Sequence, residues 1–190
     1  MADAELRDPV VADVTIAGLT LDRDATPEMV TFALLRAIKD DVDAGRDLEV
    51  REAAFDLQFQ LAAPSAIHAQ HVRAVGPEHA DLKECVYKTA RLWAPTLGHY
   101  VGSFDLSFEE ARERMHMPPV PTSLRMSRFG LEEKHVLFEA WDPDGDPNAS
   151  VVIRVRLVQQ EGRWRVWWVG FDRSRRHLPT GRERTPPDSG

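Results

Sequence analysis

The sequence predicts an α+β protein in which N-terminal helices pack on a curved antiparallel β-sheet. Apolar residues recur at helical spacing through most of the chain up to Pro121, and beyond it they recur with a period of two, which is typical of strands. The composition is 43% hydrophobic and 29% charged, as in globular domains rather than disordered or fibrous chains.

The first predicted helix follows a β-branched segment, 10–21, which favours a short strand although Gly18 weakens that prediction. Thr26 has the chemistry of an N-cap, with Pro27 at the first helical position. Gly45 suits the left-handed residue that ends a helix. We therefore expect this helix between Thr26 and Gly45.

A second helix is expected from Asp47 until Pro64 stops it. Phe55 and Phe59 widen its apolar stripe, so we expect this helix to be covered on more than one side.

Two further helices are expected before the strands. One opens at Pro77 and places Cys85 and Trp93 on its apolar face. The other opens at Ser107, which can form a capping box with Glu110, and continues to the proline pair that follows.

Strands are predicted in the C-terminal third of the chain, separated by turn residues. Their ranges are 123–129, 134–141, 150–160 and 163–171. Glu161 and Gly162 predict a tight hairpin between the last two strands, because Gly162 can adopt a positive φ.

The loop length of this hairpin determines which side chains share a face. A two-residue loop pairs Leu157 with Val166, Val155 with Trp168, and Ile153 with Gly170. One face then carries Val155, Leu157, Trp164, Val166 and Trp168. The opposite face carries Arg154, Arg156, Val158, Arg165, Trp167, Val169 and Phe171. A three-residue loop would exchange the faces of the last strand, so both registers remain open. We expect one face to meet the helices and the other to need a cover, which a partner subunit would supply.

The negative charge is concentrated at the start of the chain. The net charge is −7 at pH 7, and the first 60 residues hold 14 of the 31 acidic residues but only 6 of the 24 basic ones. Bulk charge therefore argues against nucleic-acid binding. We expect a single domain over 10–176, between a flexible start, 1–9, and a disordered, basic and proline-rich tail, 177–190.

Location is predicted from what the sequence lacks. The acidic start has no apolar core of a signal peptide, and no window approaches the roughly 18 apolar residues of a membrane span. The single Cys85 excludes an internal disulfide and suits a reducing compartment. We expect a cytoplasmic protein with no membrane partner.

The order of elements resembles one fold family. Helices are followed by an antiparallel meander whose last hairpin runs through 161–166, Glu-Gly-Arg-Trp-Arg-Val. Over about 26–171 this is similar to the nuclear transport factor 2-like (cystatin-like α+β, polyketide-cyclase-like) superfamily. The resemblance implies a cone-like sheet closed by helices around a pocket. The family usually has a β-hairpin between its second and third helices, where this chain is helical over 66–93. Members include isomerases, dehydratases, polyketide cyclases and dimeric scaffolds without chemistry, so the fold does not give the function.

A pocket of this kind can support proton abstraction. A buried carboxylate takes a proton from carbon, while a Tyr or His donates to the developing oxyanion. The candidates are Asp105 and Glu139 as base, with Tyr100, His99 and His116 as donors. The aromatic candidates for the pocket lining are Trp93, Phe104, Phe138, Trp141 and Trp168. Alternatively, these polar residues are edges of the core or caps of loops.

The last hairpin also carries an arginine- and tryptophan-rich face. Its members are Arg154, Arg156, Arg165 and Trp167, and Arg156 can stack on Trp167. Either arginine stems cover the rings on a solvated sheet, or the face is an interface, because Trp and Arg are enriched in interface cores. We favour the interface and expect a homodimer through the sheet face.

No metal or cofactor is expected. The acids between Asp142 and Asp146 alternate as in the opening of a calcium loop, but Pro147 and Ile153 replace the glycine and glutamate that such a loop needs. Exposed hairpin connections use the same residue types. The histidines near His68 lack a matching third ligand, and the sequence has no phosphate-binding loop or serine-esterase motif.

The sequence thus favours a binding or assembly module that acts as a homodimer and takes at most a small apolar ligand. The alternative is a pocket enzyme, an isomerase, dehydratase or cyclase, that acts by general acid/base proton abstraction on a small apolar carbonyl compound.

Overall fold

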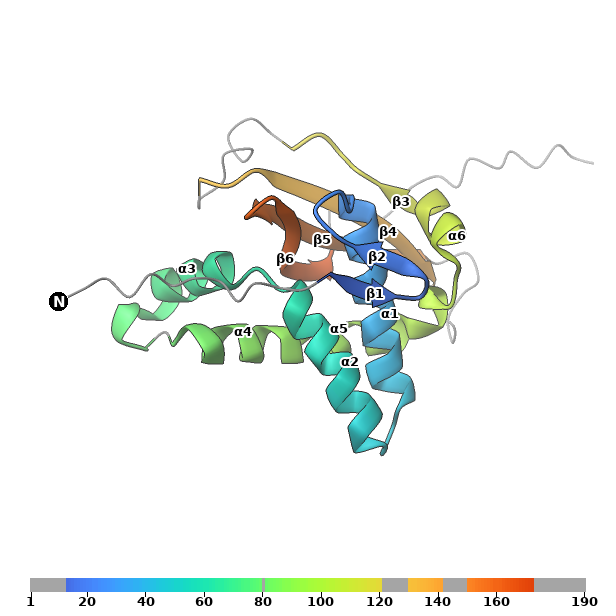
Figure 1. The fold of residues 1–190 in the computed structure, drawn as a ribbon, viewed down its shortest axis with the longest axis horizontal. Coiled ribbons are helices and arrows are strands. Elements are labelled where there is room, and N and C mark those ends of the chain that lie inside the picture. Colours follow the sequence, from blue (N-terminus) through green and yellow to red (C-terminus); the bar gives the residue numbers. More distant parts are fainter. Residues whose placement is uncertain (1–12, 80, 121–129, 142–149, 173–190) are drawn as a thin grey trace, which may run out of the picture.

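The computed structural model describes residues 13–79, 81–120, 130–141 and 150–172 and confirms the α+β class (Figure 1). It contains a four-stranded antiparallel sheet of order β3-β4-β5-β6 and a separate two-stranded sheet, β1-β2. The expected terminal segments, the expected strand 123–129 and the calcium-like loop lie outside the described residues. In the part of the chain that the structure describes, no helix has both the length and the apolar character needed to cross a membrane.

The N-terminal segment is a hairpin rather than one strand. β1 (Val14–Ile16) and β2 (Leu19–Leu21) pair antiparallel. Ala17 and Gly18 form the turn, and both have a positive φ. Gly18 therefore reverses the chain instead of weakening a single strand.

The first two helices begin where they were predicted to begin. α1 (Pro27–Asp43) begins after Thr26, whose side chain accepts the Met29 N–H at 3.3 Å. Gly45 has a φ of 56° just beyond the end of this helix. α2 (Leu48–Leu61) begins after Asp47, whose carboxylate accepts a backbone N–H in the first turn.

The middle of the chain contains more helices than expected. Pro64 starts α3 (Pro64–Val75) as well as ending α2, because proline is tolerated in the first turn of a helix. The helix expected to open at Pro77 begins later, after the N-cap Asp81. The elements that follow α3 are η1 (Pro77–His79), α4 (Leu82–Arg91), α5 (Trp93–Leu97) and η2 (Gly98–Phe104).

α6 (Phe108–Glu113) has the predicted capping box of Ser107 and Glu110. The helix is shorter than expected because the next residues form β3 (Met115–His116), which pairs with β4.

The remaining strands agree closely with the predictions. They are β4 (Glu133–Trp141), β5 (Ser150–Gln160) and β6 (Arg163–Phe171). The β5–β6 hairpin has the two-residue loop, and Glu161 and Gly162 have φ values of 51° and 74°. Two positive φ angles are what a tight hairpin of this type requires.

The register of this hairpin is correct only next to the loop. Leu157 pairs with Val166 as predicted, but the register then shifts between Arg156 and Leu157, and Arg156 pairs with Trp168. Trp167 is the extra residue of a β-bulge. The predicted pairings of Val155 with Trp168 and of Ile153 with Gly170 are therefore wrong. The observed partners are Val169 for Val155 and Phe171 for Ile153, so the two faces of β6 exchange beyond the bulge.

The sheet has two chemically different faces. We call the face that packs on α1 and η2 the inner face; it carries Phe138, Ile153, Val155 and Leu157, all of them buried. The opposite, outer face carries His135, Leu137, Glu139, Arg154, Arg156 and Trp168.

Candidate functional site

The residues predicted to line a pocket are split between the two faces of the sheet. Trp93, Phe104 and Phe138 belong to the buried core, and the Phe104 and Phe138 rings meet edge-on at 5.9 Å. Trp141 and Trp168 are half-buried and lie on the outer face. Side chains therefore fill the inner face where the family resemblance implies a pocket.

Three of the acid/base candidates lie on or next to η2, at the surface. The Asp105 carboxylate is 70% exposed and forms an ion pair with Arg36 at 3.1 Å. His99 is exposed and contacts the ring of Tyr100, which in turn contacts Phe171. These contacts hold a surface corner together, and the carboxylate lacks the burial that a general base of this kind uses.

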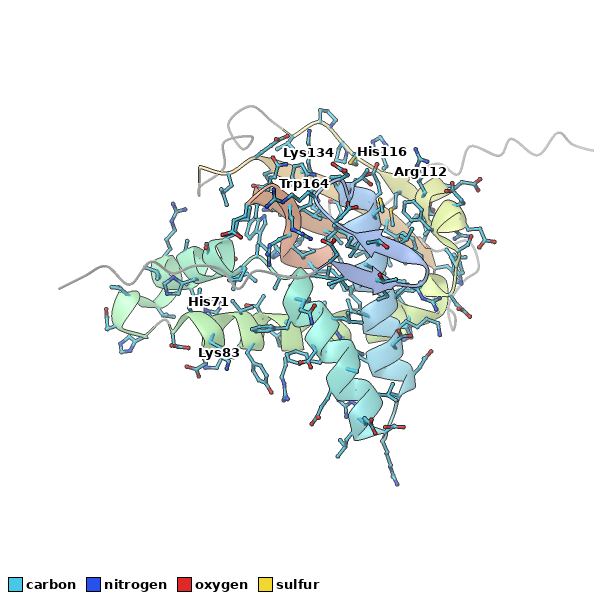
Figure 2. All side chains as sticks on the ribbon, in the orientation of Figure 1. His71, Lys83, Arg112, His116, Lys134 and Trp164 are labelled. Carbon is cyan, nitrogen blue, oxygen red and sulfur yellow. The ribbon has the colours of Figure 1, made fainter. Side chains whose placement is uncertain are left out.

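The other two candidates, His116 and Glu139, line one hollow of about 280 Å³ at the β3–β4 edge of the outer face. Figure 2 shows His116 at this edge, near Arg112 of α6. The Arg114 side chain also lines the hollow, and its guanidinium lies 3.9 Å from the centre of the Trp141 ring. The structure thus brings together one predicted base and one predicted donor.

A chain of buried and half-buried polar groups crosses the outer face. The His135 Nε2–H donates to the Glu133 carboxylate at 2.7 Å, and both side chains are 4% exposed. Arg154 donates to His135 Nδ1 at 3.2 Å and to Asp172 at 2.7 Å. Because a guanidinium has only donors, Nδ1 must accept, which places the imidazole proton on Nε2. Each of these groups has a partner, so the chain fixes the side chains of this face.

The predicted arginine–tryptophan contact is present. The Arg156 guanidinium lies 5.5 Å from the centre of the Trp167 ring and 4.9 Å from that of Trp168. Arg165 and Trp167, however, are only 4% exposed. Two of the four residues expected at an interface are therefore buried within the protomer itself.

A large hollow lies among the helices. We call it the helical groove: it measures about 830 Å³ and lies between the end of α1, the start of α2, α5 and the end of α4. Figure 1 shows that this end of the α1–α2 pair projects away from the sheet. Asp41 joins the two helices, since its carboxylate accepts from Arg51 at 3.4 Å and from Gln58 at 3.1 Å.

The groove combines apolar, aromatic and arginine side chains. Leu48 and Val42 line it and are 69% and 37% exposed. Arg91, also in the lining, lies over the rings of Tyr87 and Phe55, with its guanidinium 4.5 and 5.5 Å from their centres. Exposed apolar side chains that gather on one surface are typical of interaction sites.

Sequence reasoning missed this groove. The signal was the apolar stripe of the second helix, which Phe55 and Phe59 widen and which predicts cover on more than one side. In the structure Phe55 and Phe59 are half-buried, and the start of α2 is open at Leu48 and Val50.

Metal ligands do not gather in the described residues, where no group of three or more His, Cys, Asp or Glu side chains is placed to hold a metal ion. His71 belongs to α3 (Figure 2), and its Nε2 lies 3.2 Å from the hydroxyl of Thr89 in α4. Cys85 is buried, and this burial, with the nearby carboxylates of Glu84 and Asp81, raises the pKa of its thiol. A raised pKa disfavours the reactive thiolate.

Comparison with protein-family models, with curated proteins and with solved structures gave no match.

Proposed function

We propose that the protein is a binding and assembly module that forms a homodimer through the helical groove. The observation that carries the proposal is the exposed apolar lining of the groove, above all Leu48 at 69% exposure. Burial of such side chains against a partner is the main driving force of protein association.

The residue types around the groove are those found at the centre of protein interfaces. Tyr87, Phe55 and Arg91 are already packed against one another, with the two rings edge-on and the guanidinium over both, so little side-chain entropy is lost when a partner covers them. Aromatic residues and arginine are enriched in such positions, whereas lysine is depleted.

The charge of the groove favours a second copy of this chain as the occupant. The described lining includes two acids, Asp41 and Glu52, and two arginines, Arg51 and Arg91, and so has no net charge. A two-fold interface presents the same patch from both subunits and must be self-complementary. A patch without net charge does not repel its copy, whereas a strongly acidic or basic patch would.

The outer face of the sheet is the competing interface. It is favoured less because Arg165 and Trp167 are buried within the protomer and have little area left to offer a partner. The pocket enzyme also has less support, since Asp105 is exposed and ion-paired and aromatic side chains fill the inner face.

The proposal also includes the fold family of the domain. Helices that precede a β3-β4-β5-β6 meander support a nuclear transport factor 2-like domain, a class that includes dimeric scaffolds. A free, buried Cys85 supports a location in the reducing cytoplasm.

The test is sedimentation velocity on the full chain over a concentration series. We expect the wild type to form a dimer and Leu48→Glu to be a monomer at the same concentrations. Val75→Glu is the matched control, because Val75 is 49% exposed at the end of α3 and outside the groove lining; it should leave the dimer intact.

A monomeric wild type, or a Leu48→Glu dimer of unchanged stability, would contradict the proposal. The sheet-face dimer is tested in parallel with Arg156→Glu, checked for folding by circular dichroism. If Arg156→Glu abolishes the dimer while Leu48→Glu does not, the outer face is the interface.

A further inference from the structure

A second hollow lies where β6 meets the helices, and it shares no lining residue with the helical groove. We call it the tryptophan hollow. It measures about 300 Å³, and its walls include Trp93 of α5 and Trp167 and Trp168 of β6. We propose that the tryptophan hollow binds a small, uncharged, planar aromatic molecule that carries a hydroxyl group.

The β-bulge is the first argument. Consecutive residues of a regular strand point to opposite faces of the sheet. The register shift makes Trp167 an extra residue of β6, and Trp167 lines this hollow together with its neighbours Trp168 and Val169. Bulges are frequent beside functional sites, where they aim a side chain that a regular strand would turn away.

The position of Trp168 is the second argument. A Cβ on Gly170 would lie 2.6 Å from the Trp168 ring, so only glycine lets the indole lie this close to the backbone. The Arg156 guanidinium lies 4.9 Å from the centre of the same ring. Trp168 is therefore held in place although it is only half-buried, as a stacking surface for a ligand needs to be.

The chemistry of the walls defines the ligand class. Among the described residues that line the hollow, none carries a formal charge at neutral pH when histidine is neutral. Aromatic rings prefer to stack on other aromatic rings. The Gln70 amide can orient one polar substituent, whereas the His71 ring already contacts the Thr89 hydroxyl and the Thr96 hydroxyl already donates to the Leu92 carbonyl. The volume is at the lower limit for small-molecule pockets, which suits one or two fused rings.

The experiment is calorimetric titration of the full chain with 2-naphthol. We expect binding with a Kd of about 0.1 to 1 mM, the affinity that roughly a dozen heavy atoms provide. The fully saturated analogue, decahydro-2-naphthol, should bind at least tenfold more weakly because it cannot stack.

Two variants test the site itself. Trp168→Leu should weaken 2-naphthol binding at least tenfold. Gly170→Ala should also weaken binding while the fold is retained, because its new Cβ displaces the Trp168 ring. Trp141→Leu is the matched control, because Trp141 is also half-buried and packs against Arg114, but it does not line the tryptophan hollow. This substitution should leave the affinity unchanged. Circular dichroism shows whether each variant is folded.

The proposal is overturned if 2-naphthol gives no saturable heat, if the saturated analogue binds as tightly, or if folded Trp168→Leu keeps the wild-type affinity. It is also overturned if the affinity falls equally in Trp141→Leu. None of these outcomes depends on whether the chain is a dimer.

Discussion

Replacing Phe138 with alanine tests whether the inner face of the sheet is a packed core or a ligand pocket. Phe138 has no exposed surface, and its ring meets the buried Phe104 ring at 5.9 Å and 70°. Removing a fully buried phenylalanine leaves a cavity and lowers the free energy of unfolding by about 3 to 5 kcal/mol. That loss is a large part of the stability of an ordinary domain, about 5 to 15 kcal/mol.

The assay is urea denaturation followed by tryptophan fluorescence, with the slope of the transition compared between variants. Phe171→Ala is the control. Because Phe171 is 37% exposed, this substitution should lower the free energy of unfolding by only about 1 kcal/mol. In a double-mutant cycle, the edge-on pair with Phe104 should show a coupling of about 0.5 to 1.5 kcal/mol. A loss below about 1 kcal/mol for Phe138→Ala would refute the packed core and favour the pocket implied by the family resemblance.

Three further predictions concern local contacts. Ser103→Ala should lower the free energy of unfolding by about 1 to 3 kcal/mol in urea denaturation, because the buried Ser103 hydroxyl accepts the backbone N–H of Trp141 at 3.2 Å and its loss leaves that donor unpaired. An unchanged denaturation midpoint would show that this donor finds another partner. The hydrogen bonds from the Ser107 side chain and backbone hold the pKa of Glu110 below its usual range, so this capping interaction stabilises the fold above the ordinary carboxyl pKa and is lost as the pH falls through the lowered pKa. Ser107→Ala should therefore destabilise the protein more at pH 7 than in acid, and an equal effect at both would contradict this reasoning. Because burial raises the pKa of the Cys85 thiol, iodoacetamide should alkylate it slowly at pH 8 in the folded chain and quickly in urea, as mass spectrometry can measure; equal rates would show that the thiol is accessible.

The local signals in the sequence were sufficient to place the starts of α1, α2 and α6 and the last two strands. Thr26 and Ser107 cap helices where they were predicted to, and the second helix begins after Asp47 as predicted, because a capping side chain needs only the backbone of the next three residues. The loop at Glu161 and Gly162 was predictable for the same reason.

Features that depend on distant contacts were not predictable. Pro64 has the same chemistry whether it ends one helix or starts the next, and here it does both. The alternation of residues along β6 does not predict the bulge at Trp167, because one inserted residue changes the strand register without changing the residue types.

The candidate sites show the same limit. The apolar stripe that includes Phe55 predicts which helix surface is buried, but it does not predict whether this chain or a partner buries it. The spacing of Trp93 and Trp168 gives no sign that α5 and β6 bring them to one hollow. Conversely, Asp105 was a candidate base on residue type alone, and its exposure and its pairing with Arg36 depend on tertiary structure.

Chemical crosslinking between copies tests the proposed assembly most directly. Leu48→Cys protein and Pro95→Cys protein, both in a Cys85→Ala background, are mixed and treated with a flexible bis-maleimide. Leu48 and Pro95 both line the helical groove, so a groove-mediated dimer should give a covalent product that contains one chain of each variant. Val75→Cys replaces Pro95→Cys in the control, and little product is expected because Val75 lies outside the groove lining. A yield no higher than this control would contradict assembly through the helical groove.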